Sequence, residues 1–135
     1  MAEGYSEITL DHYESPRNRG LLADSNARVT RSNPVCGDQL TLTLRISNEA
    51  VEAAGFEVKG CVAATAAASM MTELVANLPL SDAIGLSAGE IEAALGGLPA
   101  GRGHGAVLAA ETLMEALEHA SARPSGPADV ERHAP

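Results

Sequence analysis

Aromatic residues and cysteines are scarce in this chain of 135 residues. It contains no Trp, one Phe and two Tyr, so its core has to be built from aliphatic side chains and the abundant alanines. Small side chains let helix backbones approach closely, which favours packed helices. The two cysteines are too few for a disulfide framework, and in a reducing compartment they are expected to stay thiols.

Basic residues are also scarce. Nine Lys and Arg stand against eighteen Asp and Glu, which gives a net charge of −9. Nucleic acid and anionic membrane surfaces are therefore not expected partners, because both require a cationic field that neutralises phosphates. No apolar run reaches the roughly 18 residues of a membrane span. The start MAEGYSEITL lacks the basic and apolar regions of a secretory signal, so we expect a cytoplasmic protein.

The hydrophobic pattern predicts an α+β domain, a three-stranded antiparallel sheet packed against several helices. Residues 39–46, QLTLTLRI, alternate between apolar and polar side chains, which is typical of a half-buried strand. The β-prone stretches 27–32 and 51–60 supply its neighbours, the second across the turn SNEA. Helices follow the strands, which argues for an α+β arrangement.

Helical signals occupy most of the remaining chain. Helices are predicted over residues 5–14 with Ser6 as N-cap, over 62–77, after a Ser87/Glu90 capping box, and over 105–120. The expected stripe of the first long helix is Val62, Ala66, Met70 and Leu74 or Glu73, and that of the last is Val107, Ala110, Met114 and Leu117 with Leu113 beside them. Residues 1–120 are expected to form the domain. Residues 121–135, rich in Pro and poor in apolar side chains, are expected to form a disordered tail.

Four residues with metal-binding side chains stand at turns or helix starts. Cys36 and Asp38 lie in the loop PVCGD, Cys61 lies where a strand ends and a helix begins, and His104 follows a Gly-rich loop. Thiolate, carboxylate and imidazole groups can bind Zn²⁺, and an Fe–S cluster also tolerates histidine. The residues alone leave the alternative open that both cysteines are buried apolar side chains and that His104 faces solvent.

The other residues with chemically active side chains have structural interpretations. His12 is expected to pack near the end of the first helix, and Met70 and Met71 to fill gaps in the core. Arg17 is either structural or faces a partner. Glu111, Glu115 and Glu118 are expected to form a solvated helix face.

At these residues the chain resembles the NifU-like, IscU-type family of iron–sulfur cluster assembly scaffolds. The resemblance runs from about Tyr5 to Ala120. The motifs that carry it, in order, are HYESPRNRG (12–20), NPVCGD (33–38), FEVKGCVAATAAASMMTE (56–73) and LPAGRGHGAVLAAETLMEAL (98–117).

The resemblance implies both a fold and a function. The fold is a small α+β domain. Members receive sulfur from a cysteine desulfurase, build a [2Fe–2S] cluster and pass it to acceptor proteins. Carried over to this chain, Cys36, Cys61 and His104 bind the cluster or metal, and Asp38 is the acidic neighbour that keeps the site labile.

Two positions depart from the family pattern. The third cysteine is expected directly after the histidine, where this chain has Gly105. Restoring a cysteine there is expected to strengthen cluster retention if the rest of the site is intact. The family's chaperone motif retains only Leu98 and Pro99, which leaves recruitment of an Hsp70-type chaperone doubtful.

The main functional hypothesis is a non-enzymatic scaffold or carrier for iron–sulfur assembly with an atypical ligand set. The alternative is a Zn- or iron-binding paralogue that docks or regulates a cysteine desulfurase without building clusters. Two further hypotheses are a sulfurtransferase-like persulfide acceptor and an interaction module without a cluster. The missing third cysteine argues against the persulfide acceptor.

Overall fold

A three-stranded antiparallel meander forms the sheet of the protein. The computed structural model describes residues 4–34, 37–122 and 132–133. The strands are β1 (Ala27–Ser32), β2 (Gln39–Ser47) and β3 (Ala50–Lys59), with β2 in the centre. The predicted α+β fold and three-stranded sheet are thus confirmed.

Two short features extend beyond the predicted domain boundary at residue 120. The last helix continues to Ala122, and the two-residue strand β4 (Arg132–His133) pairs in parallel with the edge of β1. Residues 123–131 and 134–135 lie outside the described part of the chain. The disordered tail therefore stays a prediction.

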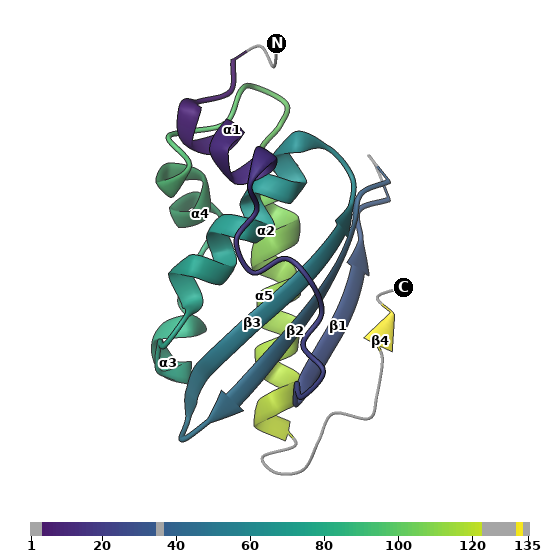
Figure 1. Ribbon diagram of the computed structural model, residues 1–135, viewed down its shortest axis with the longest axis vertical. Helices are drawn as coiled ribbons and strands as arrows, with labels where there is room; N and C mark the ends of the chain where they lie inside the picture. The colour runs from purple at the N-terminus through teal and green to yellow at the C-terminus, as the bar shows by residue number, and fades with distance from the viewer. Residues whose placement is uncertain (1–3, 35–36, 123–131, 134–135) are drawn as a thin grey trace.

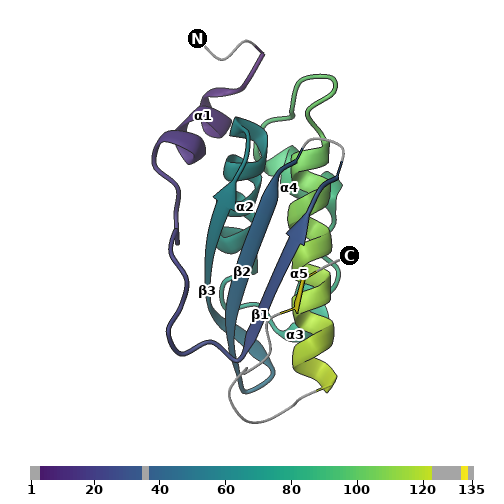
Figure 2. The same ribbon diagram turned by 90° about the vertical axis from the view of Figure 1, so that its right-hand side faces the viewer.

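Five helices accompany the sheet: α1 (Glu7–Glu14), α2 (Val62–Val75), α3 (Leu80–Ala83), α4 (Ala88–Ala94) and α5 (His104–Ala122). Figures 1 and 2 show α2 and α5 side by side on one face of the sheet, where α2 packs on β3 and α5 on β1 and β2. The predicted N-cap Ser6 and the Ser87/Glu90 capping box are both present. Within the described residues, no helix has both the length and the apolar character needed to cross a bilayer.

The hairpin between β2 and β3 sets the register of the sheet. Asn48 and Glu49 both have positive φ angles, 55° and 60°, which is the geometry of a tight turn that matches the twist of the strands. The turn places Leu42 opposite Phe56 and Leu44 opposite Ala54, so the apolar residues of the two strands share the helix-covered face. All four side chains are buried.

The second face of the sheet is less exposed than the alternating pattern predicted. Thr43 is fully buried, and its Oγ1 accepts a hydrogen bond from the backbone N–H of Leu22 (3.0 Å) and donates one to the carbonyl of Gly55 (2.9 Å). A Cβ at Gly55 would overlap the carbonyl oxygen of Gly20. The segment before β1, seen beside β3 in Figure 2, therefore covers part of this face.

The predicted buried face of α5 was partly wrong. Val107 is 42% exposed and Met114 is 37% exposed, whereas Leu117 is buried as expected. The residues of α5 described as buried are Gly105, Ala106, Leu108, Ala109, Thr112, Leu113, Ala116 and Leu117. Gly105 and the three alanines make up half of this face, because α5 lies close to α2, and α2 is itself buried around most of its circumference, from Ala63 to Thr72. The predicted stripe is therefore displaced from the packed face at Val107 and Met114.

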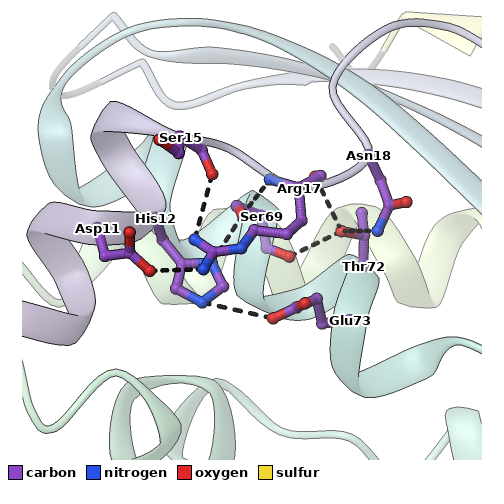
Figure 3. A network of polar contacts seen from close by, with 8 residues as sticks. All are labelled: Asp11, His12, Ser15, Arg17, Asn18, Ser69, Thr72 and Glu73. Atoms are coloured by element: carbon purple, nitrogen blue, oxygen red, sulfur yellow. Dashed lines mark hydrogen bonds and ion pairs between the residues drawn. The ribbon is translucent and has the colours of Figure 1, made fainter.

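A polar network joins α1 and the following turn to α2 (Figure 3). His12 is 4% exposed; its Nδ1 lies 2.7 Å from Ser69 Oγ, and its Nε2 lies 3.4 Å from Glu73 Oε1. Ser69 Oγ also accepts a hydrogen bond from the backbone N–H of Arg17 (2.8 Å). A neutral His12 that accepts at Nδ1 from Ser69 and donates from Nε2 to Glu73 satisfies all these groups.

The same network fixes the turn after α1. Arg17 makes an ion pair with Asp11 (2.5 Å) and donates to the carbonyl of Ser15, and Asn18 Nδ2 donates to Thr72 Oγ1 (3.1 Å). Of the two interpretations left open for Arg17, these contacts support the structural one. The HYESPRN segment thus ties the first helix to the central helix of the core.

We expect His12 to make the protein less stable in mild acid. Burial lowers the pKa of His12 and Arg17 lowers it further, while Glu73 and Asp11 oppose the shift. Because the pKa in the folded chain is below that in the unfolded chain, about 6.5, the unfolded chain binds more protons. Stability is therefore complete above that pH and falls as the pH drops towards the folded pKa.

Urea unfolding of the wild type and of His12→Gln at pH 7.5 and 5.5 measures this effect. At pH 7.5 the variant is expected to lose about 1 kcal/mol, because glutamine replaces the hydrogen bonds imperfectly. The loss of stability between pH 7.5 and 5.5 is expected to be smaller in the variant than in the wild type. Equal losses in both proteins would contradict the assignment.

Candidate metal centre

Three segments of the chain that are distant in sequence meet at one end of the molecule. They are the connection from β1 to β2, the junction of β3 with α2, and the start of α5 (Figure 1). Each contributes one side chain to a cluster of Asp38, Cys61 and His104. One potential ligand atom from each of these residues lies within 4.8 Å of the others.

Asp38 is held at the entrance to β2 by a tight loop. The backbone N–H of Gly37 donates to the carbonyl of Asn33 (2.8 Å), and the N–H of Asn33 donates to the carbonyl of Asp38 (2.8 Å). Gly37 has φ +78°, a left-handed conformation that glycine adopts without strain. The Asp38 residue is only 4% exposed. A buried carboxylate of this kind requires compensating donors or a cation.

Cys61 supplies part of that compensation. Its backbone N–H donates to Asp38 Oδ1 (3.1 Å), and its Sγ lies 3.3 Å from Asp38 Oδ2. Cys61 is the N-cap residue of α2, and its side chain makes no hydrogen bond to the helix backbone. The thiol is therefore directed to the Asp38 carboxylate rather than used as a helix cap.

His104 completes the cluster from the first position of α5. Its Nε2 lies 3.9 Å from Asp38 Oδ2, and its side chain is 30% exposed, against 5% for that of Asp38. The N-termini of α2 and α5 thus both lie beside the cluster. The partial positive charge at helix N-termini favours negatively charged groups there.

The donor set matches the chemistry of a soft or borderline metal ion. Oxygen, sulfur and nitrogen ligands are those of Zn²⁺, and thiolate with imidazole also suits iron in Fe–S centres. Tetrahedral ligands about 2.0 to 2.3 Å from a metal lie roughly 3.3 to 3.8 Å apart. The separations of Asp38 Oδ2 from Cys61 Sγ and His104 Nε2, 3.3 and 3.9 Å, are close to that range. A cation between these atoms would also remove the repulsion between an ionised thiol and carboxylate.

The structure places the sequence-predicted site residues as follows. Asp38, Cys61 and His104 come together, as the family resemblance implied and as the residues alone had left open. Cys36 lies outside the described residues. Its proposed role as a ligand therefore stays a prediction.

The remaining polar candidates lie away from the cluster. His12 is in the α1–α2 network, and Arg31 pairs with Glu115 (2.8 Å) and Glu111 (3.3 Å) on the outside of α5. Met70 and Met71 are buried in the core as predicted. None of these residues belongs to the metal-type cluster found among the described residues.

Three further neighbours of the site were not predicted. Gly60 lies against Asp38, since a Cβ at residue 60 would overlap the carboxylate. Burial raises the pKa of Tyr5; Arg102 opposes this, and Cys61 and Asp38 raise the pKa further, so Tyr5 lies within electrostatic range of both Arg102 and the site. Of these neighbours, only Gly60 had a signal in the sequence, because it directly precedes Cys61. The positions of Tyr5 and Arg102 depend on tertiary packing.

A side chain at position 60 is expected to destabilise the site. Gly60→Ala forces the Asp38 carboxylate or the β3–α2 junction to move, at a cost of about 1–3 kcal/mol. Gly89→Ala in α4 is the matched control, because its Cβ would meet only Ser87 Oγ at 3.8 Å. Urea unfolding without metal measures both variants. The cost of Gly60→Ala should shrink in an Asp38→Ala background, and an undiminished cost would contradict the assigned contact.

Comparison with known proteins identifies relatives of the whole domain. The family described as "NifU-like N terminal domain" matches residues 4–125. The iron–sulfur cluster assembly scaffold protein IscU of Aquifex aeolicus is 38% identical over 120 residues, which cover 87% of this chain and 76% of that protein. The zinc-dependent sulfurtransferase SufU of Bacillus subtilis is 41% identical over 83 residues, which cover 62% of this chain and 56% of that protein.

The solved structures support the same fold. A putative iron–sulfur cluster assembly scaffold protein for the SUF system from Fervidobacterium islandicum AW-1 superposes with a TM-score of 0.70. The match covers 84% of this chain and 96% of the other at 22% identity. At that identity the likeness bears on the fold alone.

Proposed function

Because the chain belongs to the family of NifU-like N-terminal domains, we propose that it is an iron–sulfur cluster assembly scaffold or carrier with an atypical ligand set. The observation that carries the proposal is the convergence of Asp38, Cys61 and His104 at one end of the fold. The cargo is iron or a [2Fe–2S] cluster that is held transiently. Zn²⁺ is a further ion that this donor set can bind.

Each site residue has a distinct proposed role. Cys61, together with Cys36 two residues before Asp38 in the chain, supplies the thiolates that iron–sulfur clusters prefer. His104 supplies an imidazole in place of a third thiolate, since position 105 is glycine. Asp38 is a hard oxygen donor in a soft ligand set, so its bond to iron is the weakest, which suits a cluster that has to leave.

The burial of the site is compatible with transfer. Asp38 is covered, whereas Cys61 and His104 are partly exposed, so the sulfur and imidazole side of the site is open to a partner. The cluster's sulfide has to be supplied from outside the site, because the site residues are ligands and not a source of sulfide. The proposed partners are a cysteine desulfurase that supplies sulfur and iron–sulfur acceptor proteins that take the cluster, in the reducing cytoplasm.

A second candidate function uses the same residues. One relative carries the name zinc-dependent sulfurtransferase. In this alternative, Asp38, Cys61 and His104 hold Zn²⁺ or iron permanently, and the protein docks or regulates a cysteine desulfurase or accepts sulfur from it. The O, S and N donor set, which suits Zn²⁺ as well as iron, is the observation that favours it.

Anaerobic reconstitution with Fe²⁺, cysteine, a cysteine desulfurase and dithiothreitol, which reduces the persulfide sulfur to sulfide, is expected to produce a visible-absorbing cluster on the wild type. Cys61→Ser and Cys36→Ser should lose most of it, because each removes a thiolate, and His104→Ala should retain less than half. His119→Ala, a histidine substitution at the far end of α5, is the matched control and should behave as the wild type. A cluster unaffected by Cys61→Ser would contradict the proposal.

Metal content and mass spectrometry separate the second candidate from the first. One equivalent of tightly bound Zn²⁺ with no cluster under the same anaerobic conditions would favour the zinc-binding function. After incubation with desulfurase and cysteine, a mass increase of one sulfur atom on Cys61 or Cys36 would indicate a sulfur acceptor. A scaffold is expected to show cluster formation and no persistent added sulfur on either cysteine.

A further inference from the structure

Gly105 occupies a position with no room for a side chain. The residue is buried at the second position of α5, directly after His104. A Cβ built on it would lie 2.8 Å from the carbonyl carbon of Ala63, 2.8 Å from the backbone nitrogen of Ala64 and 2.9 Å from the carbonyl oxygen of Ala63. Separations this short are not found for real Cβ atoms, so the first turn of α5 approaches α2 as closely as two backbones can.

The atoms that a Cβ at position 105 would meet cannot move away by a change of side-chain rotamer. All three belong to the backbone of α2, and Ala63 and Ala64 are 0% and 2% exposed. The start of this helix is held in place because the N–H of Cys61, two residues earlier, donates to Asp38. A side chain at position 105 therefore has to push α5 away from α2 as a unit.

His104 would move with it. The imidazole is on the residue before Gly105, and Cys61 lies two residues before Ala63, so the helix contact joins the two segments that carry these side chains. Separation of α5 from α2 therefore moves His104 away from Cys61, although one ligand atom of each now lies within 4.8 Å of the other. The geometry of the site therefore depends on the contact between α2 and α5.

We propose that Gly105 is a positioning residue for the metal site: its missing side chain lets α5 begin against α2 and thereby places His104 beside Asp38 and Cys61. This inference rests on the proposed function. It also reverses the expectation from sequence that a cysteine at position 105 would restore a lost ligand. Among the described residues the potential ligands are Asp38, Cys61 and His104, and a thiol at position 105 displaces His104 instead of adding to it.

Three variants test the inference. Gly105→Ala adds only the Cβ, and Gly105→Cys adds the Cβ and a thiol. Gly103→Ala is the matched control, because its Cβ would meet only Glu92 Oε1 at an ordinary 3.5 Å. The measurements are thermal unfolding of the metal-free protein and anaerobic titration with Co²⁺, a spectroscopic probe for the site.

Both substitutions of Gly105 are expected to lower the unfolding midpoint by roughly 5–10 °C through overpacking. Both should weaken Co²⁺ binding by about tenfold or more, the usual effect of losing a group that orients a ligand. The Gly103→Ala control should match the wild type in both measurements. If Gly105→Ala is unfolded at 25 °C, the titration is repeated in trimethylamine N-oxide, which favours compact states.

A double-mutant cycle separates positioning from a general loss of stability. Gly105→Ala should weaken Co²⁺ binding in the wild-type background but have little effect in a His104→Ala background, because the ligand it positions is already gone. An equal loss in both backgrounds would mean that Gly105 does not act through His104, and would overturn the proposal.

Two other outcomes would also overturn it: Gly105→Ala binding Co²⁺ as the wild type does, or Gly105→Cys binding it more tightly with added thiolate-to-cobalt absorption. Failure of the wild type itself to bind Co²⁺ or a cluster would instead count against the proposed function. The unfolding midpoints of the metal-free variants would still decide whether Gly105 is required for the helix contact, so the two failures are distinguishable.

Discussion

The close contact between α2 and α5 is the constraint on which the core and the candidate site both depend. With a single Phe and no Trp, the chain cannot fill a wide space between layers, so its helices have to lie near each other. Alanines from both helices form much of the buried surface, and Gly105 marks the closest approach. The same contact brings the N-termini of the two helices together at one end of the sheet, where Cys61 and His104 are found.

The electrostatics of the site follow from that arrangement. Two helix N-termini lie beside Asp38, a buried carboxylate directly before β2. Although the protein as a whole has a net charge of −9, hydrogen-bond donors and the partial positive charges of two helix N-termini surround the Asp38 carboxylate at this end of the fold. Gly60 makes the arrangement possible, since only a residue without a side chain leaves space for the carboxylate. Glycines at positions 60 and 105 therefore shape the site as much as the potential ligands do.

The first helix contributes to the site at a distance. Its His12 and the following Arg17 are bound to Ser69 of α2, which fixes α1 against the central helix (Figure 3). Ser6, the N-cap of α1, also donates to the carbonyl of Leu95 at the end of α4. These contacts hold α1 against α2 and α4. The HYESPRN segment therefore stabilises the helices around the site without supplying a ligand.

The sequence by itself determined the α+β class, the alternation in β2, the caps of α1 and α4, and the residue types that bind metal. These are local properties, fixed by periodicity, capping and side-chain chemistry within a few residues. Side-chain chemistry alone left open whether Asp38, Cys61 and His104 meet, which the family resemblance implied and the tertiary structure shows. Only the tertiary structure decided that Val107 and Met114 face outwards and that position 105 has no room for a side chain. Each of these depends on how closely α5 approaches α2 and the sheet, a distance set by the packing of many small side chains that no local pattern encodes.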